Sequence, residues 1–273
     1  MKAESYAAGT IINALATFKG VAFGIDLKIR GRFRENDSKR LCIVENGKIV
    51  EMPILYKIFR NISGVIEIES EIPRRSGLGS SSAFMNVLLI LAAKIKGEKL
   101  NAEKILKANA RMSLETGMSY TGAFDDASAS LLGGVVFSDN LKMKLFKREI
   151  LEGDVIILLP DFKRGEINLR RIREDKEIVE RAFKLAMEGK FKEAMLLNSM
   201  HYCRKIGLPL EPVISVQDLN VAAGLSGNGP CYVAFGEDVS DVESIWKNFG
   251  KTIRKRIVNE PAEDVRIPKT LFW

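Results

Sequence analysis

Apolar and acidic side chains alternate along residues 65–72, where three isoleucines fall on one face and three glutamates on the other. Strict alternation predicts a strand with one buried face, and Pro73 ends it. Residues 83–93 are almost wholly apolar and follow a run of serines. A helix that is apolar all round must be buried, and a serine at its start is a good N-cap. The pattern therefore predicts a strand, a loop and a buried helix in direct succession.

Patterns elsewhere predict a mixture of further helices and strands. Asn101 caps a predicted helix through residues 106–114, and apolar residues at helical spacing predict another between Asp175 and Gly189. Short apolar runs predict buried strands at residues 133–137, 155–159 and 231–235. Several consecutive strand pairs among the helices favour an α+β fold over a purely parallel βαβ sheet.

The length of the chain fits one large domain or two smaller ones that share a cleft. The 273 residues are 46% apolar, which suffices for a core and excludes a disordered chain. We place a boundary near residue 150, so that an N-terminal domain of residues 1–150 carries the loop after Pro73. Residues 151–273 then form the C-terminal domain.

Nothing in the sequence predicts export or a membrane anchor. The longest apolar run, residues 87–93, is far shorter than the ~20 residues that span a bilayer. The N-terminus has no sustained apolar stretch, and three scattered cysteines without a CxxC pair argue against a disulfide framework and a zinc site. We expect a soluble cytoplasmic protein without a membrane partner.

The net charge of +7 comes from basic residues that are interleaved with acidic ones. Such a surface attracts small anions more readily than it binds a long polyanion, so we expect no nucleic-acid partner. An RNA-binding protein is the alternative from another class, and it predicts tight binding with a steep salt dependence.

The motifs that the chain lacks restrict its chemistry. There is no GxxxxGK[ST] loop, and GxGxxG fails because a serine stands where the third glycine is required. The single histidine, His201, has no partner motif, which excludes HExxH metal sites and argues against a Ser-His-Asp triad. Any reaction must use carboxylates, hydroxyls, backbone amides and cations.

The loop after Pro73 combines glycines and serines in the sequence PRRSGLGSSSA, residues 73–83. Glycines let the backbone turn its N–H groups toward a ligand, and the following helix adds unpaired N–H groups and the positive end of its dipole. A polyphosphate fits that arrangement, and serine hydroxyls can bind phosphate oxygen or a Mg²⁺ water. A simple turn with a capping serine is the alternative.

This segment resembles the second motif of the GHMP kinases, PxxxGLGSSAA, and departs from it only at Ser82, where the family usually has Ala. The resemblance implies that the loop wraps the phosphates of ATP. It also implies that Ser81, or Ser80 as second choice, helps to hold Mg²⁺. The implied ATP-binding residues are Pro73, Gly77, Leu78, Gly79, Ser80, Ser81, Ser82 and Ala83.

Residues 226–231, SGNGPC, resemble the third motif of that family, a glycine turn beside the phosphate loop and the substrate. On this resemblance Gly227 and Gly229 are candidate substrate contacts. A Gly-Asn-Gly-Pro sequence taken alone is usually just a turn, so the support lies in its order and distance from the first segment.

Residues 120–127, YTGAFDDA, resemble the family segment whose aspartate faces the acceptor hydroxyl, which implies catalytic roles for Asp125 and its neighbour Asp126. Glu115 falls close to where several members place a glutamate that binds Mg²⁺. Phosphoryl transfer itself needs a carboxylate that orients or deprotonates the nucleophile. If the segment is extended, one aspartate points inward and the other supports it. A helix cap or turn is the alternative for this pair.

The N-terminal stretch GTIINALATFKGVAFGIDL, residues 9–27, looks like the start of the archaeal shikimate kinases, a branch of the GHMP superfamily. Ala8-Gly9-Thr10 stands where the wider family has PGK, so the role of that lysine is not carried over. The resemblance implies a two-layer α+β fold with a ribosomal-S5-like N-terminal half and a ferredoxin-like C-terminal half. It also implies ATP-dependent phosphorylation of shikimate to shikimate 3-phosphate, for aromatic amino acid biosynthesis.

Shikimate carries one carboxylate and three hydroxyls, so its site needs a cation and several hydrogen-bond partners. The candidate contacts are Asn13, Lys19, Asp26 and Thr121. A homoserine or mevalonate kinase is the alternative within the same class.

Overall fold

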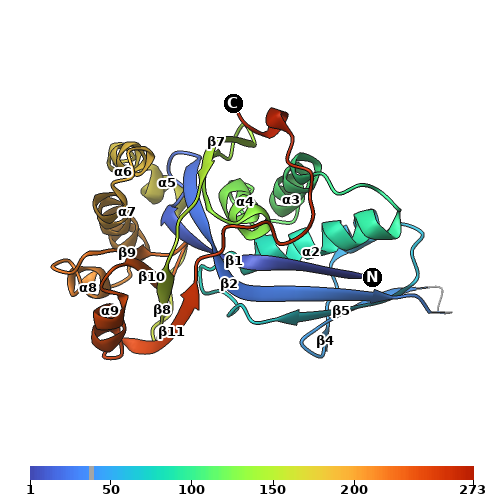
Figure 1. Cartoon of the computed structure of the whole chain (residues 1–273), viewed down its shortest axis with the longest axis horizontal. Coiled ribbons are helices and arrows are strands. Elements are labelled where there is room, and N and C mark those ends of the chain that lie inside the picture. The colour runs from blue at the N-terminus through green and yellow to red at the C-terminus, as the bar shows by residue number, and fades with distance from the viewer. Residues whose placement is uncertain (37–39) are drawn as a thin grey trace.

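The computed structural model describes residues 1–36 and 40–273, which form two β-sheets with helices packed against them (Figure 1). The strands are β1 (Lys2–Ile12), β2 (Lys19–Arg34), β3 (Leu41–Glu45), β4 (Lys48–Ile49), β5 (Gly64–Ser70), β6 (Val135–Asp139), β7 (Lys144–Glu149), β8 (Asp154–Pro160), β9 (Val221–Leu225), β10 (Tyr232–Gly236) and β11 (Gly250–Arg256). The helices are α1 (Pro53–Ile58), α2 (Ser80–Ile95), α3 (Ala102–Glu115), α4 (Phe124–Leu132), α5 (Leu169–Arg173), α6 (Glu177–Met187), α7 (Phe191–Ile206), α8 (Glu211–Ile214), α9 (Val239–Trp246) and the 3₁₀ helix η1 (Lys269–Leu271). In the described ranges, no helix combines the length and apolar character that a bilayer crossing requires.

The first sheet has the order β4-β3-β5-β2-β6-β7, with β1 paired to β2. The long strand β2 holds it together, because its first residues pair with β6, its last with β5, and β1 runs antiparallel along most of its length. Only the β3–β5 pair is parallel among the described ladders. The strand predicted at residues 65–72 is confirmed as β5, which ends at Ser70, and Ile66 and Ile68 of this strand are buried.

Helices α2 and α4 pack on one face of this sheet, against β1 and β2, and α3 packs on both of them (Figure 1). A buried set of amides joins the three helices. The Asn109 side chain donates to the carbonyl oxygen of Ser82 and to Asn86, both at 2.8 Å, and Asn86 donates to Ala127 O at 2.9 Å. Each buried amide is therefore paired, and the start of α2 is held in register with α4.

The second sheet has the order β11-β8-β10-β9 and is wholly antiparallel. Helix α7 packs against β9 of the second sheet and against β1 of the first, and α6 also packs against β1. The two sheets therefore share one buried core. The chain passes from the first sheet to the second between Glu149 and Asp154. Division into domains at residue 150 stays a prediction.

The C-terminal segment, residues 257–273, returns to the first half of the chain, where Figure 1 shows it in red beside α4 and α3. Arg266 pairs with the residues before α3 through Ala102 N–H and Leu100 O, and Trp273 N–H donates to Leu145 O. The carboxylate of Glu263 accepts from the Glu4 N–H at 2.9 Å and pairs with Lys94 at 2.7 Å. This segment covers the edge of β1, which would otherwise be an open strand edge.

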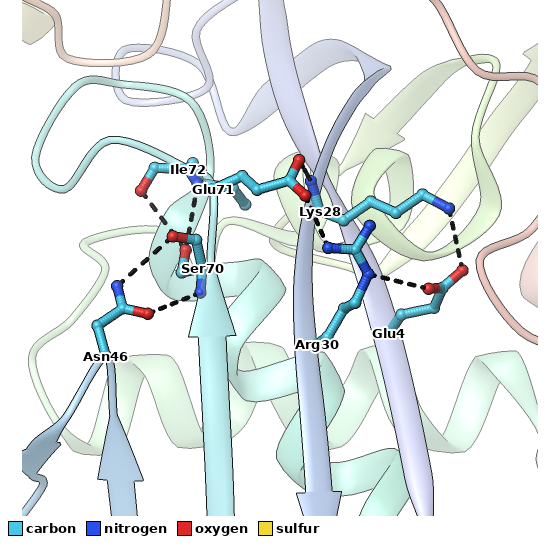
Figure 2. Close-up of polar contacts among 7 residues, drawn as sticks. All are labelled: Glu4, Lys28, Arg30, Asn46, Ser70, Glu71 and Ile72. Carbon is cyan, nitrogen blue, oxygen red and sulfur yellow. Dashed lines mark hydrogen bonds and ion pairs between the residues drawn. The ribbon is translucent and has the colours of Figure 1, made fainter.

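Charged residues cover the opposite face of the first sheet near the end of β5 (Figure 2). Arg30 on β2 pairs with Glu71 at 2.7 Å, and hydrogen bonding to this guanidinium lowers the pKa of the Glu71 carboxyl. Lys28 and Arg30 both reach Glu4 on β1, while Asn46 accepts from Ser70 N–H at 3.0 Å. Such exposed pairs add little stability each, and they connect β1, β2 and the residue after β5.

The predicted helices and strands occur, with shifted ends. Asn101 caps α3 through Lys104 N–H at 3.1 Å, as expected. The expected serine cap of α2 is wrong: Gly79 is the N-cap, in the left-handed conformation, and no side chain caps the helix. The serine hydroxyls of the first turn are therefore left available to a ligand.

Candidate active site

A cavity of about 270 Å³ lies where the loop before α2, the segment before α4 and the end of β1 meet. The second half of the chain also contributes to its wall. The lining residues that matter for the chemistry are Thr10, Asn13, Arg75, Gly77, Gly79, Ser80, Ser81, Ser82, Thr121, Asp125, Asp126, Arg164, Gly227 and Asn228.

The loop before α2 has an unusual backbone in which positive φ recurs at every second residue. Arg75, Gly77 and Gly79 have φ values of 57°, 91° and 65°. Alternating left-handed positions turn successive N–H groups into one concavity, which is the geometry that binds anions. The backbone at residues 75–79 therefore forms an anion-binding type of concavity and is more than a simple reversal of the chain.

The first turn of α2 adds to the same concavity. Its first helical hydrogen bond runs from Ala83 N–H to Gly79 O, so the N–H groups of Ser80, Ser81 and Ser82 have no partner within the helix. No acidic residue lies in this turn to occupy them. The helix dipole and these N–H groups favour an anion at this point.

The glycine turn at residues 226–230 packs directly against the phosphate loop. A Cβ on Gly77 would lie 2.1 Å from the Ser226 carbonyl oxygen, so only glycine fits there. The Ser226 hydroxyl donates to Gly77 O at 2.9 Å, and Cys231 N–H donates to Ser76 O at 3.0 Å. These contacts join the second and third motif-like segments across about 150 residues of sequence.

Asp125 lies in the first turn of α4 and is 5% exposed. The side chain of Asn140 holds it at two points: Nδ2 donates to Asp125 Oδ1 at 2.8 Å, and Oδ1 of Asn140 accepts from Asp125 N–H at 3.2 Å. The carboxylate packs on Gly20, where a Cβ would lie 2.2 Å from Oδ2. The Asp125 side chain is therefore held between Asn140 and Gly20.

Asp126 follows in the same helical turn and also lines the cavity. Burial raises the pKa of the Asp125 carboxyl, against the opposing effect of its bond to Asn140. The pKa of Asp126 is raised further, by burial and then by the charge of Asp125. Two adjacent carboxylates with raised pKa values favour a cation or a proton between them.

The aspartates lie in the first turn of a helix and not in an extended segment, so the condition under which only one of them would point inward does not apply. Ala123, with φ of 46°, starts a helix at Phe124, so both side chains leave the same end of α4. Because successive helical residues are about 100° apart, both can reach one cavity, whereas alternate residues of a strand cannot.

Asn13 links the end of β1 to the glycine turn. Its side-chain amide donates to Gly227 O at 2.7 Å and to Asn228 at 2.9 Å, and its own N–H donates to Asn198 at 3.0 Å. Tyr202 donates to Asn13 O at 2.8 Å. Asn13 therefore lines the cavity with its amide already engaged by protein groups.

The structure separates the predicted residues into three groups. Those that line the cavity are Asn13, Gly77, Gly79, Ser80, Ser81, Ser82, Thr121, Asp125, Asp126 and Gly227. Those that flank it without lining it are Pro73, Leu78, Ala83 and Gly229, of which Leu78 and Ala83 are buried in the core.

Lys19, Asp26 and Glu115 are not brought to the cavity. Lys19 is exposed, and its Nζ lies 5.8 Å from the centre of the Phe183 ring. Asp26 lies in the middle of β2. Glu115 ends α3 on the surface, where its carboxylate pairs with Lys57 at 2.9 Å. Two other cationic residues, Arg75 and Arg164, line the cavity.

Six lining or supporting residues were not among the candidates named from the sequence: Thr10, Gly20, Arg75, Asn140, Arg164 and Asn228. Asn140 follows Asp125 by 15 residues and has no recognisable motif around it. Gly20 lies in β2, far from Asp125 in the sequence. No local pattern identifies either, because their roles depend on tertiary contacts alone. Thr10 was visible only as a departure from PGK.

Comparison with known proteins assigns the class. The profile of the GHMP kinases N-terminal domain matches residues 49–134. A mevalonate kinase crystal structure superposes with a TM-score of 0.73 at 14% identity, covering 95% of this chain and all of the other. The galactokinase of Lactococcus lactis gives 0.72 at 12% identity, covering 95% of this chain and 94% of the other. At such low identity these two likenesses show the fold, which is the α+β fold expected from the sequence.

The chain belongs to the GHMP kinase family, and it is an enzyme of the kinase class whose phosphoryl donor is ATP. Its full-length relatives are shikimate kinases. That of Archaeoglobus fulgidus is 46% identical over all of this chain and 98% of its own length. That of Methanocella arvoryzae is 37% identical over 94% of both chains.

Proposed function

We propose that this protein transfers the γ-phosphoryl group of ATP to shikimate, forming shikimate 3-phosphate and ADP. The observation that carries the proposal is the meeting of the phosphate-shaped loop and Asp125 in one cavity. The acceptor is inferred from full-length similarity to the shikimate kinase of Archaeoglobus fulgidus.

The loop and the first turn of α2 receive the phosphates of ATP, with the N–H groups of Ser80 to Ser82 directed at their oxygens. Asp125 orients the acceptor hydroxyl or takes its proton as the oxygen attacks the γ-phosphorus. The new O–P bond forms while the bond between the γ-phosphorus and the bridging oxygen breaks, and ADP leaves with that oxygen. A raised pKa makes Asp125 a better base near neutral pH than an ordinary carboxylate.

The cavity also suits Mg²⁺. This ion prefers oxygen ligands and is usually held by one or two carboxylates together with substrate phosphates. Asp126 and the hydroxyl of Ser81 would hold it. Its positive charge would stabilise the ionised forms of the adjacent carboxyls of Asp125 and Asp126, whose pKa values are raised without it. When bound, the ion neutralises charge on the phosphates. The described residues contain no cluster of three or more His, Cys, Asp or Glu suited to a metal, so phosphate oxygens and waters must complete the coordination.

The carboxylate of shikimate needs a positive partner, and two arginines line the cavity. Arg75 belongs to the phosphate loop and lies with the nucleotide. Arg164 lies between β8 and α5, in the half of the chain that contributes Gly227 and Asn228. We assign the shikimate carboxylate to Arg164, because an arginine fork matches a carboxylate in two hydrogen bonds.

The reaction takes place in the cytoplasm on this proposal, which is supported by three cysteines that are free thiols. A homoserine or mevalonate kinase is the rival reading, since the fold alone is shared with mevalonate kinase. An RNA-binding role is opposed by a cavity in which two carboxylates face the phosphate loop.

The test is a coupled assay of ADP release with Mg²⁺, ATP and one alcohol at a time: shikimate, homoserine or mevalonate. We expect turnover with shikimate and at least tenfold lower kcat/KM with the other two alcohols. Turnover with homoserine alone would show that the acceptor is wrong while the kinase class stands.

A further inference from the structure

Thr10 has a buried hydroxyl without a hydrogen-bond partner at the wall of the cavity. The side chain is 2% exposed, and its Oγ1 contacts no donor or acceptor among the described residues. A buried hydroxyl that is left unpaired destabilises the folded chain, and most buried polar groups in native proteins are paired. Its persistence at a cavity wall points to a partner that arrives with the ligand.

The backbone of Thr10 is tied to the phosphate loop. Its N–H donates to the Ser226 hydroxyl at 3.1 Å, and that hydroxyl donates to Gly77 O at 2.9 Å. Two residues earlier, Ala8 N–H donates to Leu78 O at 3.1 Å. The end of β1 is therefore bound to the loop at two points, and Thr10 cannot move away from it independently.

The side chain of Thr10 lies on the loop side of β1. Alternate residues of a strand share a face, and the Ala8 Cβ lies 3.0 Å from the position of a Cβ on Gly79. Asp126 approaches the same position from the other side, with its Cβ at 3.5 Å. Ala8 and Asp126 thus both contact the glycine that precedes the serines of α2, and Thr10 and Asp126 line the same cavity.

We propose that Thr10 Oγ1 donates a hydrogen bond to a phosphate oxygen of the bound nucleotide. The inference rests on the proposed function as far as the loop holds ATP, but it does not depend on which alcohol accepts the phosphoryl group. A neutral donor suits this point, because it pairs with an anionic oxygen without forming an ion pair with the nearby Asp126. The hydroxyl thus helps to select a polyphosphate.

The test compares Thr10→Val, which removes the hydroxyl at nearly constant shape, with Thr10→Ser, which keeps it. Ser130→Ala is the matched control, since the Ser130 hydroxyl is also buried and unpaired but does not line the cavity. The probe is the Mg²⁺ complex of a non-hydrolysable ATP analogue, and its affinity is measured by calorimetry. The midpoint of thermal unfolding of each ligand-free variant is recorded beside it.

We expect Thr10→Val to bind the analogue about 10–100-fold more weakly, the range for one hydrogen bond to a charged group. Thr10→Ser and Ser130→Ala should stay within about threefold of the wild type, on the same scale. Ligand-free Thr10→Val should unfold no earlier than the wild type, because no bond is lost on replacing an unpaired hydroxyl.

Unchanged analogue affinity in Thr10→Val would overturn the proposal, and so would a loss confined to the KM of shikimate. An equal loss in Thr10→Ser would assign the effect to packing. If the wild type binds the analogue but does not phosphorylate shikimate, the acceptor assignment fails while Thr10 is still judged by the variants. If the wild type binds no nucleotide, both proposals fall.

Discussion

Asn140 holds Asp125 from both sides of its residue, by donating to the carboxylate at 2.8 Å and accepting from the backbone N–H at 3.2 Å. The Ser138 hydroxyl in turn donates to the side-chain oxygen Oδ1 of Asn140 at 2.7 Å, which fixes the orientation of the Asn140 amide. Asn140 and Ser138 do not line the cavity themselves, but they orient the Asp125 carboxylate, which does.

Asn140→Ala should raise the pKa of Asp125 further, because the bond that opposes the effect of burial is lost. Activity depends on the ionised carboxylate, so the acidic limb of the kcat profile should move to higher pH. At the optimum, kcat should fall about tenfold or more, the scale of one lost hydrogen bond to a charged group. The pH–rate profile measures both effects. Ser138→Ala should shift the limb less in the same direction, and an unmoved limb in Asn140→Ala would contradict the account.

Asp125→Asn should lower kcat by ~10²–10⁴ while the fold persists, the range for loss of a general base. Single-turnover rates at saturating ATP and shikimate measure this effect. Near-normal turnover would remove Asp125 from its assigned role.

Asp126→Asn should make the ligand-free protein more stable at neutral pH. A carboxyl with a raised pKa in the folded state costs no stability below the ordinary aspartate pKa, and its cost grows as pH rises from that ordinary value to the raised one, above which it stays constant. The wild type should therefore lose stability over that rise, and the variant should lose less. Unfolding midpoints at a series of pH values test this difference. Equal pH dependence in the two proteins would show that Asp126 is not strained in the folded state.

Gly20→Ala should displace the Asp125 carboxylate, since the new Cβ would lie 2.2 Å from Oδ2. We expect kcat to fall by about 10² or more, the cost of misplacing a catalytic group by roughly 1 Å. Affinity for ATP should change little. Gly31→Ala is the control, because Gly31 lies in the same strand, β2, but its new Cβ would press on Val87 of helix α2 and not on Asp125. Equal losses of kcat in both folded variants would refute the positional argument.

Arg164→Ala should raise the KM for shikimate by about 10–100-fold, the worth of a charged hydrogen-bond pair, with the KM for ATP nearly unchanged. Lys163→Ala removes a neighbouring charge that does not line the cavity, and it should leave both constants near the wild-type values. Initial-rate kinetics with each substrate varied in turn separate the two. A rise in the KM for ATP instead would place Arg164 with the nucleotide.

The sequence was sufficient for those parts of the site that follow from local geometry. Positive φ values and close contacts require glycine at positions 77 and 79. The alternation of apolar and acidic residues predicted β5, and the long apolar run predicted the buried helix α2. Glu115 was misplaced because spacing from a motif does not say which face of α3 a residue occupies. It lies outward, against Lys57.

Gly20 and Asn140 could not be found because their roles exist only once β2, α4 and the turn after β6 have packed. The helical start at Ala123 was missed for a related reason. A non-glycine residue with positive φ has no sequence signature, and it is this residue that brings both aspartates to one cavity.

On our proposal, the loop at residues 75–82 and Asp125 form one phosphoryl-transfer site for shikimate. Mass spectrometry of shikimate incubated with the wild type, Mg²⁺ and ATP tests it most directly, with Asp125→Asn as the comparison. We predict a product heavier by one phosphoryl group with the wild type and a rate lower by ~10² or more with the variant. Unmodified shikimate after incubation with folded, ATP-binding wild-type protein would contradict the account.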